Sequence, residues 1–321
     1  MSFLSGITVV CFIASYGVAL ALEVVRLFYR NPLRRILTLA FAGAGLFAHT
    51  VFLAHRAVAA TGAPLSSAFD WYLLAAWALV IVYLYLAWQY PQMASGLFVL
   101  PLVLGLIGVA KFADREPFPQ SHAGQIWGLI HGLFLLMGLV TVTLGFVAGM
   151  MYLIQAYRLK HKLPASGGTR LPSLEWLERV NHRSIVVSVL MIGIGFASGI
   201  VLNMVLQHRK IDEVPWSDPI IWTTGAMFAW LLAAAVFSGV YRPARSGRKV
   251  AYLTVASFAV LAATLGIKLL VPSEHGGEKT RVEAGGPLAQ PLSEDARSAT
   301  AAFASRLNGG FGAAPYLEER A

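Results

Sequence analysis

Long hydrophobic stretches without any charged residue dominate the chain and alternate with short segments that hold most of the charges. No charged residue occurs in residues 1–22, 71–110 or 118–157. About 20 apolar residues are enough for a helix to cross a bilayer, so each stretch can supply one or two membrane helices. The pattern therefore predicts an all-α, polytopic membrane protein.

Eight transmembrane helices are expected, because Tyr90-Pro91-Gln92 divides the second stretch in two. Proline disfavours a continuous helix both at its own position and at the residue before it. We expect the fifth span to project beyond the membrane, since it is longer than a bilayer requires. The predicted spans are approximately 3–25, 36–55, 69–89, 95–110, 125–157, 184–207, 219–241 and 250–271.

Lysine and arginine are unequally distributed between the segments that connect these spans. Fourteen follow the first, fifth and seventh spans, whereas five follow the second, fourth and sixth. Basic residues concentrate in short cytoplasmic loops of membrane proteins, so the first set is expected inside. Both termini are then expected outside, on the outer side of a bacterial cytoplasmic (inner) membrane that the chain crosses several times.

The composition agrees with a membrane protein and excludes a soluble globular enzyme. Hydrophobic residues make up 57% of the chain and charged residues 13%, whereas soluble domains carry about 25% charged residues. The basic loops account for the net charge of +9, so we expect the lipid bilayer as a partner and no nucleic acid. Cys11, the single cysteine, lies within the first span and offers no disulfide.

The end of the chain has a different composition from the predicted transmembrane helical domain, residues 1–272. Residues 273–321 are rich in Gly, Ala, Ser, Glu and Arg and contain no apolar stretch of span length. Too little hydrophobic surface is available to offset the entropy lost on ordering such a segment. We expect a mostly disordered tail outside the membrane.

A few polar and aromatic residues in or near the spans are candidates for function, because polar groups are costly inside a membrane. His49 and Arg56 are seven residues apart and share one helical face, as do Asp70 and Trp77. All the candidates are expected in the outer half of the membrane or at its outer surface. The others are Trp127, His131, Trp216, Asp218, Trp222 and His275.

Histidines and tryptophans that share a location would suit an axially ligated haem. Imidazole nitrogens ligate haem iron, and flat indole rings can pack against the macrocycle. Two simpler interpretations stay open. An intramembrane histidine often forms a hydrogen bond to a neighbouring helix, and outer tryptophans such as Trp71, Trp216 and Trp222 commonly anchor a protein at the membrane surface.

Four segments occur in an order that resembles one known family. They are His49-x6-Arg56, the segment from Pro64 to Trp77, the helix from His131 to Gln155, and Leu171-Pro172-Ser173-Leu174-Glu175. Their order and spacing resemble the cytochrome c assembly (haem-handling) proteins, particularly the eight-span CcsA-, HemX- and YpjD-like members. The resemblance covers roughly residues 40–275.

This resemblance implies a subunit of cytochrome c maturation that holds haem b at the outer membrane face and delivers it to apocytochrome c. Such a subunit would work in a haem lyase or synthase complex with a second membrane subunit. His131 matches the first iron ligand, His275 matches the second by position, and His49 matches a span histidine on the haem's inward route. The predicted cofactor-binding set is completed by Trp216, Asp218, Trp222, Asp70, Trp77 and Trp127.

The chain departs from the family pattern in its tryptophan-rich loop and in its seventh span. The loop is shorter than the family's, and Val240 stands where a second span histidine is expected. Two alternatives therefore stay open: a cofactor-free membrane scaffold or regulatory subunit derived from the same family, and a transporter of a small amphipathic solute. A visible spectrum separates them from the haem-binding hypothesis, since bound haem gives a Soret band.

Overall fold

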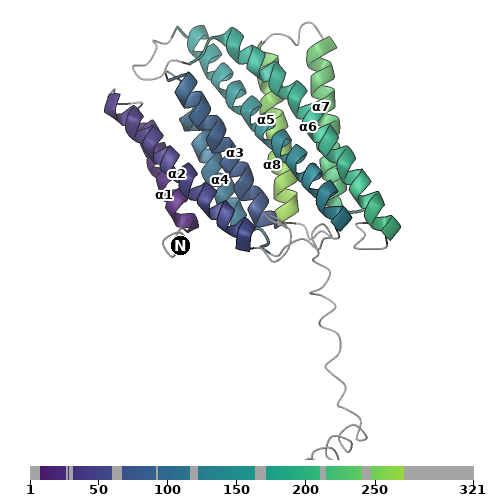
Figure 1. Cartoon of the computed structure of the whole chain (residues 1–321). Coiled ribbons are helices and arrows are strands. Elements are labelled where there is room, and N and C mark those ends of the chain that lie inside the picture. The colour runs from purple at the N-terminus through teal and green to yellow at the C-terminus, as the bar shows by residue number, and fades with distance from the viewer. Residues whose placement is uncertain are drawn as a thin grey trace, which may run out of the picture. The chain divides into compact units, whose positions relative to one another are not determined.

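Eight α-helices and no strand form the described part of the chain, as the sequence predicts (Figure 1). The computed structural model describes residues 8–26, 28, 32–59, 67–91, 93–115, 122–162, 171–209, 215–240 and 247–270. The expected domain boundary at 272, the tail and His275 lie outside these residues. The helices are α1 (Val9–Val25), α2 (Pro32–Ala59), α3 (Ala68–Gln89), α4 (Gly96–Ala110), α5 (His122–Lys160), α6 (Leu174–Arg209), α7 (Pro219–Val240) and α8 (Gly247–Leu270).

Six of these helices, α2, α3, α5, α6, α7 and α8, are long and apolar enough to cross a membrane. The other two, α1 and α4, are apolar but shorter, with 17 and 15 residues. The chain is thus an all-α, polytopic membrane protein. The predicted interruption is confirmed, because α3 ends at Gln89 and α4 begins at Gly96, on either side of Pro91.

The largest difference from the predicted spans occurs in α6, which begins ten residues earlier than the span predicted from residue 184. Ser173 caps this helix, since its hydroxyl accepts a hydrogen bond from the Trp176 N–H at 3.3 Å. Buried Leu177 alternates at helical spacing with exposed, charged residues such as Arg179. The segment therefore has too many charges to resemble a span, although its periodicity is that of an amphipathic helix.

Helices α1–α4 form one packed group and α5–α8 form another. In the first group, α1 packs on α2 and α4, and α3 packs on the same two helices. In the second, α5 and α6 share the most extensive helix–helix contact, and α8 packs on α5, α6 and α7. The contact of α3 with α5 joins the groups. Figure 1 shows the two sets of helices side by side.

Helix direction brings most of the predicted site residues to one end of the bundle. The first residue of α1 and the last residue of α8 lie at the same end, which is the lower end in Figure 1. Because consecutive helices run in opposite directions, α2 and α6 end there and α3, α5 and α7 begin there. The side of the membrane that this end faces stays a prediction from the basic residues.

Candidate functional site

Two polar contacts fasten α2 to α3 and use residues that the sequence had singled out separately. Arg56 binds Asp70 through both carboxylate oxygens, with Nε 2.5 Å from Oδ1 and Nη2 3.3 Å from Oδ2. Ser67 caps α3 and donates its hydroxyl to the same carboxylate at 2.7 Å. Further along, the Trp77 Nε1–H donates to the Thr50 hydroxyl at 2.8 Å. We call these two contacts the α2–α3 clamp.

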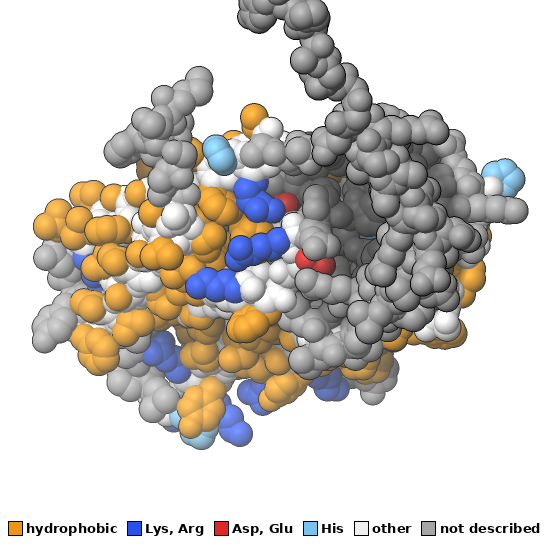
Figure 2. Space-filling model, turned by 90° about the horizontal axis from the view of Figure 1, so that it is seen from below, with side chains coloured by type: hydrophobic (Ala, Val, Ile, Leu, Met, Phe, Trp, Pro, Cys, Tyr) orange, Lys and Arg blue, Asp and Glu red, His pale blue; other side chains and the backbone are white. Residues whose placement is uncertain are grey.

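Two arginines pack against Phe69 beside the Arg56–Asp70 contact of this clamp. The guanidinium carbons of Arg56 and Arg115 each lie 5.0 Å from the centre of the Phe69 ring. Phe69 is buried, and its N–H donates to the Asp114 carbonyl at 3.0 Å. Figure 2 views this end of the bundle and shows basic side chains gathered beside acidic ones among hydrophobic side chains.

His49 is completely buried between α1 and α2. Its ring stacks on Phe12 of α1, with ring centres 4.2 Å apart and planes only 4° from parallel. The Tyr16 hydroxyl lies 3.3 Å from Nδ1. In the described part of the chain, Nε2 is buried without a hydrogen-bond partner. Leaving a buried polar atom unsatisfied costs about 1–3 kcal/mol, and a ligand bound at this nitrogen would remove that cost.

His131 has a fixed orientation on α5. Its Nδ1 lies 2.7 Å from the Gly195 carbonyl of α6, and a carbonyl can only accept a hydrogen bond, so Nδ1 carries the proton. Nε2 therefore carries the lone pair, which is the form of imidazole that ligates iron. Close approach to α6 requires Gly199, where a Cβ atom would lie 2.7 Å from the ring. His131 thus has the tautomer that a haem ligand requires, and its ring is held against α6.

Trp71 packs on α5 at Gly132, the residue after His131, although the sequence assigns it to the membrane surface. A Cβ atom at Gly132 would be 2.5 Å from the indole ring, so the ring rests directly on the α5 backbone at the residue after His131. Trp71 also directly follows Asp70 on α3, so this contact joins α5 to a helix of the α2–α3 clamp. No local pattern marks this contact, because it joins two helices that are distant in the sequence.

The remaining predicted residues lie at the starts of α5 and α7. Trp127, Trp216 and Trp222 are exposed to 36%, 44% and 70%, which suits either a surface anchor or a flat ligand. Asp218 is buried and caps α7, since its Oδ1 accepts the Ile220 N–H at 2.8 Å. His49 packs with α1, whereas His131 packs with α6, so the two histidines occupy different helix groups.

Comparison with known proteins identifies the family of the chain. Residues 65–274 match the family described as Cytochrome C assembly protein. The chain belongs to this family. The matched region contains the α2–α3 clamp residue Asp70, the ligand candidate His131 and the Trp216–Trp222 segment, whereas His49 precedes it.

Curated relatives of this family share about a quarter of their residues with the chain. The cytochrome c biogenesis protein CcsA of Guillardia theta is 23% identical over 252 residues, which cover 70% of this chain and 80% of the relative. The protein of the same name from Synechococcus sp. (strain CC9605) is 25% identical over 237 residues, covering 64% and 75%. No solved structure matches the chain significantly.

A polar cluster at the opposite end of α1 was not singled out in the sequence. Glu23, which is buried, accepts a hydrogen bond from the Tyr83 hydroxyl at 3.3 Å and pairs with Arg26 at 3.4 Å. Arg26 also donates to the carbonyls of Met93 and Pro91 at 2.7 and 2.8 Å. We call this cluster the α1 anchor. Glu23 directly follows an uncharged apolar stretch. In the sequence it therefore resembles a charged residue of an ordinary loop.

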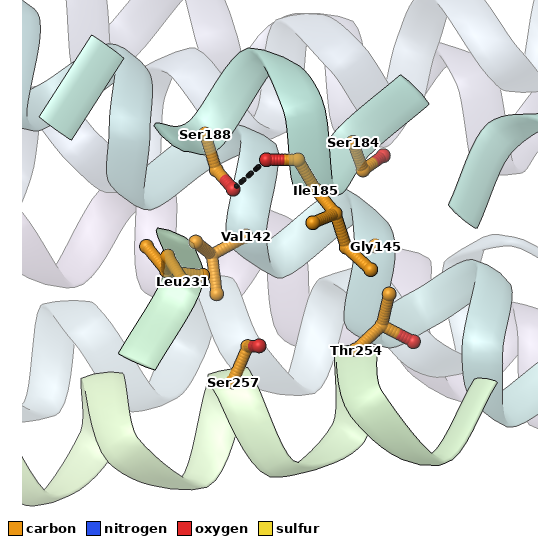
Figure 3. A pocket seen from close by; sticks show the side chains of 8 residues that line it. All are labelled: Val142, Gly145, Ser184, Ile185, Ser188, Leu231, Thr254 and Ser257. Atoms are coloured by element: carbon orange, nitrogen blue, oxygen red, sulfur yellow. Dashed lines mark hydrogen bonds between the residues drawn. The ribbon is translucent and has the colours of Figure 1, made fainter. Parts of the chain in front are cut away.

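A small cavity lies between α5, α6, α7 and α8 (Figure 3). Its volume is about 10 Å³, measured as the space open to the centre of a water molecule. This space is far too small for a haem. The Ser188 hydroxyl donates to the Ile185 carbonyl of its own helix at 2.8 Å. The cavity is lined by Val142, Gly145, Ser184, Ile185, Ser188, Leu231, Thr254 and Ser257.

Proposed function

We propose that this chain is a haem-handling subunit of cytochrome c maturation, which holds haem b at the outer membrane face for transfer to apocytochrome c. Membership of the cytochrome c assembly family supports a role in cytochrome c maturation. The observation that carries the haem-binding part is the fixed tautomer of His131. Its hydrogen bond to Gly195 leaves Nε2 with the lone pair that iron requires.

In this proposal the protein supplies ligation and orientation. Bound haem would supply the vinyl groups to which the cysteines of the apocytochrome add. His131 would hold the iron from a direction set by α5 and α6, and Trp71 would limit the movement of α3 beside it. His275 would act as the second ligand, with Trp216 and Trp222 against the macrocycle.

His49 would serve an earlier stage, on the inward route of the haem through the membrane. Its Nε2, which is buried and has no hydrogen-bond partner among the described residues, supports this role, since a permanently structural histidine would normally have both nitrogens satisfied. We place the protein in a bacterial inner membrane, together with a second membrane subunit. The apocytochrome would meet the outer face of this complex.

A cofactor-free scaffold or regulatory subunit is a second candidate. Val240 favours it, because this residue replaces the second span histidine expected from the resemblance and is 77% exposed at the end of α7. The shortened tryptophan loop points in the same direction. In a scaffold, the Arg56–Asp70 pair and the capped helices would serve stability alone.

Bound haem in the protein purified in detergent distinguishes these functions. We expect a Soret band in the parent, a strong loss in His131→Ala and a smaller loss in His275→Ala. We expect this difference because His131 is held on a helix by its hydrogen bond to Gly195. The sequence predicts no helix at His275, and fixing the backbone of such a residue costs about 1–2 kcal/mol. Added imidazole should partly restore both variants by filling the vacant coordination position.

His161→Ala is the control, since this residue directly follows the last residue of α5, at the opposite end of the helix from the site. It should leave the haem content unchanged. A parent without haem, or retention of the parent spectrum by both His131→Ala and His275→Ala, would contradict the proposed site.

A further inference from the structure

A completely buried amide on α6 lies beside the cavity between α5, α6, α7 and α8, and we propose that the two form a binding site for an internal water molecule. The amide belongs to Asn181, which has no exposed surface. Neither its Oδ1 nor its Nδ2 has a hydrogen-bond partner among the described residues. Buried polar groups in folded proteins are nearly always hydrogen-bonded to protein or to ordered water. The site goes beyond the proposed function, since no haem takes part in it.

Three polar side chains of α6 share the helical face that meets this cavity. Ser184 and Ser188 follow Asn181 by three and seven residues and therefore lie on successive turns of the same face. Both serines line the cavity. Residues three apart on a helix have Cβ atoms about 5–6 Å apart, a separation that one bridging water molecule can span.

The packing of α5 brings Asn181 to the level of a second residue that lines the cavity. A Cβ atom at Gly145 of α5 would lie 3.1 Å from the Ser184 Cβ. Because α5 and α6 run in opposite directions, Gly149, one turn further along α5, faces Asn181, one turn back along α6. At Gly149, an added Cβ atom would collide with the hydroxyl of Thr254 of α8, which also lines the cavity. Asn181 and Thr254 thus approach α5 at the same level.

The hydroxyl groups around the cavity have already used their hydrogens. Ser188, Thr254 and Ser257 each donate to a carbonyl of their own helix, at 2.8, 2.9 and 2.8 Å. Ser257 also accepts the Trp230 Nε1–H at 3.1 Å, which joins α7 to α8. Since a hydroxyl has a single hydrogen, the lone pairs that remain on these oxygens can only accept. Figure 3 shows that these hydroxyls come from α6 and α8, on opposite sides of the cavity.

These hydrogen-bonding capacities select water as the ligand. The Asn181 Nδ2 requires an acceptor, whereas its Oδ1 and the hydroxyl lone pairs require a donor. A metal cation cannot accept, an anion cannot donate, and none of the eight described residues that line the cavity is charged. All eight are buried, and the cavity volume of about 10 Å³ is close to what one water molecule requires.

The bound water would link α6 to α8 across the glycines of α5, at a distance from the proposed haem ligand. Ser188 precedes Gly199, the residue of α6 that lies against His131, by 11 residues. This spacing corresponds to about 16 Å along the helix. The two sites can therefore be perturbed separately.

Solid-state NMR of the full chain in lipid bilayers tests the water site without any haem. Asparagine with an isotopically labelled side-chain nitrogen gives only four amide signals, because the chain contains Asn31, Asn181, Asn203 and Asn308. Asn181→Leu removes one signal and thereby assigns it, and Asn181→Gln serves the same purpose if the leucine variant does not fold. Magnetisation from water protons should reach the Asn181 amide at the shortest mixing times, before it spreads through the protein.

Two serines of α6 provide a matched pair of variants. Ser188 and Ser198 are both buried, and each donates to the carbonyl three residues earlier at 2.8 Å. Only Ser188 lines the cavity. Ser188→Ala should therefore lower the rate of transfer to Asn181 at least about twofold, because the water loses one acceptor. Ser198→Ala should leave this rate unchanged.

Thermal unfolding gives a second measurement, since leucine has nearly the shape of asparagine. With water bound to the amide, Asn181→Leu should lower the unfolding midpoint by about 2–4 °C, the shift expected for one lost hydrogen bond. A higher midpoint would show that the amide is unpartnered in the protein and would overturn the site. No transfer to Asn181 in the parent overturns it, and so do equal rates in Ser188→Ala and Ser198→Ala.

Discussion

The ion pair between Arg56 and Asp70 should make a measurable contribution to stability, because the carboxylate is largely shielded from water. Its side chain is only 6% exposed, against 31% for Arg56. Removing one partner of a fully buried pair costs about 3–5 kcal/mol. Arg56 retains some solvent and the Phe69 ring, so we expect about 2–3 kcal/mol for Asp70→Ala and less for Asp70→Asn, which keeps an acceptor for Ser67.

A double-mutant cycle isolates the pairwise part of this energy. The free energy of unfolding would be measured by titration with a denaturing detergent for Arg56→Ala, Asp70→Ala and the double variant. We expect the coupling energy to be about 1–2 kcal/mol. The exposed pair Arg179–Glu175, 3.6 Å apart on one face of α6, is the matched control. Its coupling should stay below about 0.5 kcal/mol.

A coupling energy for Arg56 and Asp70 no larger than that of the control pair would refute this reasoning. The carboxylate would then be stabilised by Ser67 and the start of α3 alone, because acidic groups near a helix N-terminus gain only about 0.3–1 kcal/mol. In that case, the α2–α3 clamp would depend on Trp77 and Thr50.

Three further predictions concern packing, orientation and the tail. Gly132→Ala should displace the Trp71 ring and lower the thermal stability, whereas Gly128→Ala, which meets nothing within 4 Å, should not; unfolding followed by tryptophan fluorescence compares them. A cysteine at Ser246, in a chain without Cys11, should react with a membrane-impermeant thiol reagent only after cells are permeabilised. Deletion of residues 280–321 should leave insertion and thermal stability nearly unchanged, and a large loss of folded protein would show that the tail docks on the helices.

Helix number and type could be predicted from the sequence because a membrane helix depends mainly on local composition. The uncharged stretches and Pro91 were enough to place eight helices and the break between α3 and α4. The same dependence on composition placed the beginning of the sixth span at residue 184, ten residues after the first residue of α6. The first turns of α6 carry the charged residues Glu175 and Arg179, so these turns do not resemble a membrane span in composition. Leu177 between them is nevertheless buried.

Contacts between helices could not be predicted in the same way. Arg56 and Asp70 were both singled out, yet their spacing along the chain gives no sign that they face each other. Trp71 is a surface anchor by composition, and only the position of Gly132 on a neighbouring helix makes it a contact between α3 and α5. The role of a side chain at a helix crossing depends on the register between helices, which composition does not encode.

The division of the bundle into two helix groups has a consequence for biosynthesis. Within α1–α4, the neighbours of each helix are almost all supplied by the first part of the chain. This half can therefore pack, and enclose His49, while α5 is still being synthesised. The environment of His131 is complete only after α6 has been inserted. Two polypeptides divided between α4 and α5 would retain nearly every interhelical contact within one polypeptide or the other, with the α3–α5 surface to bring them together.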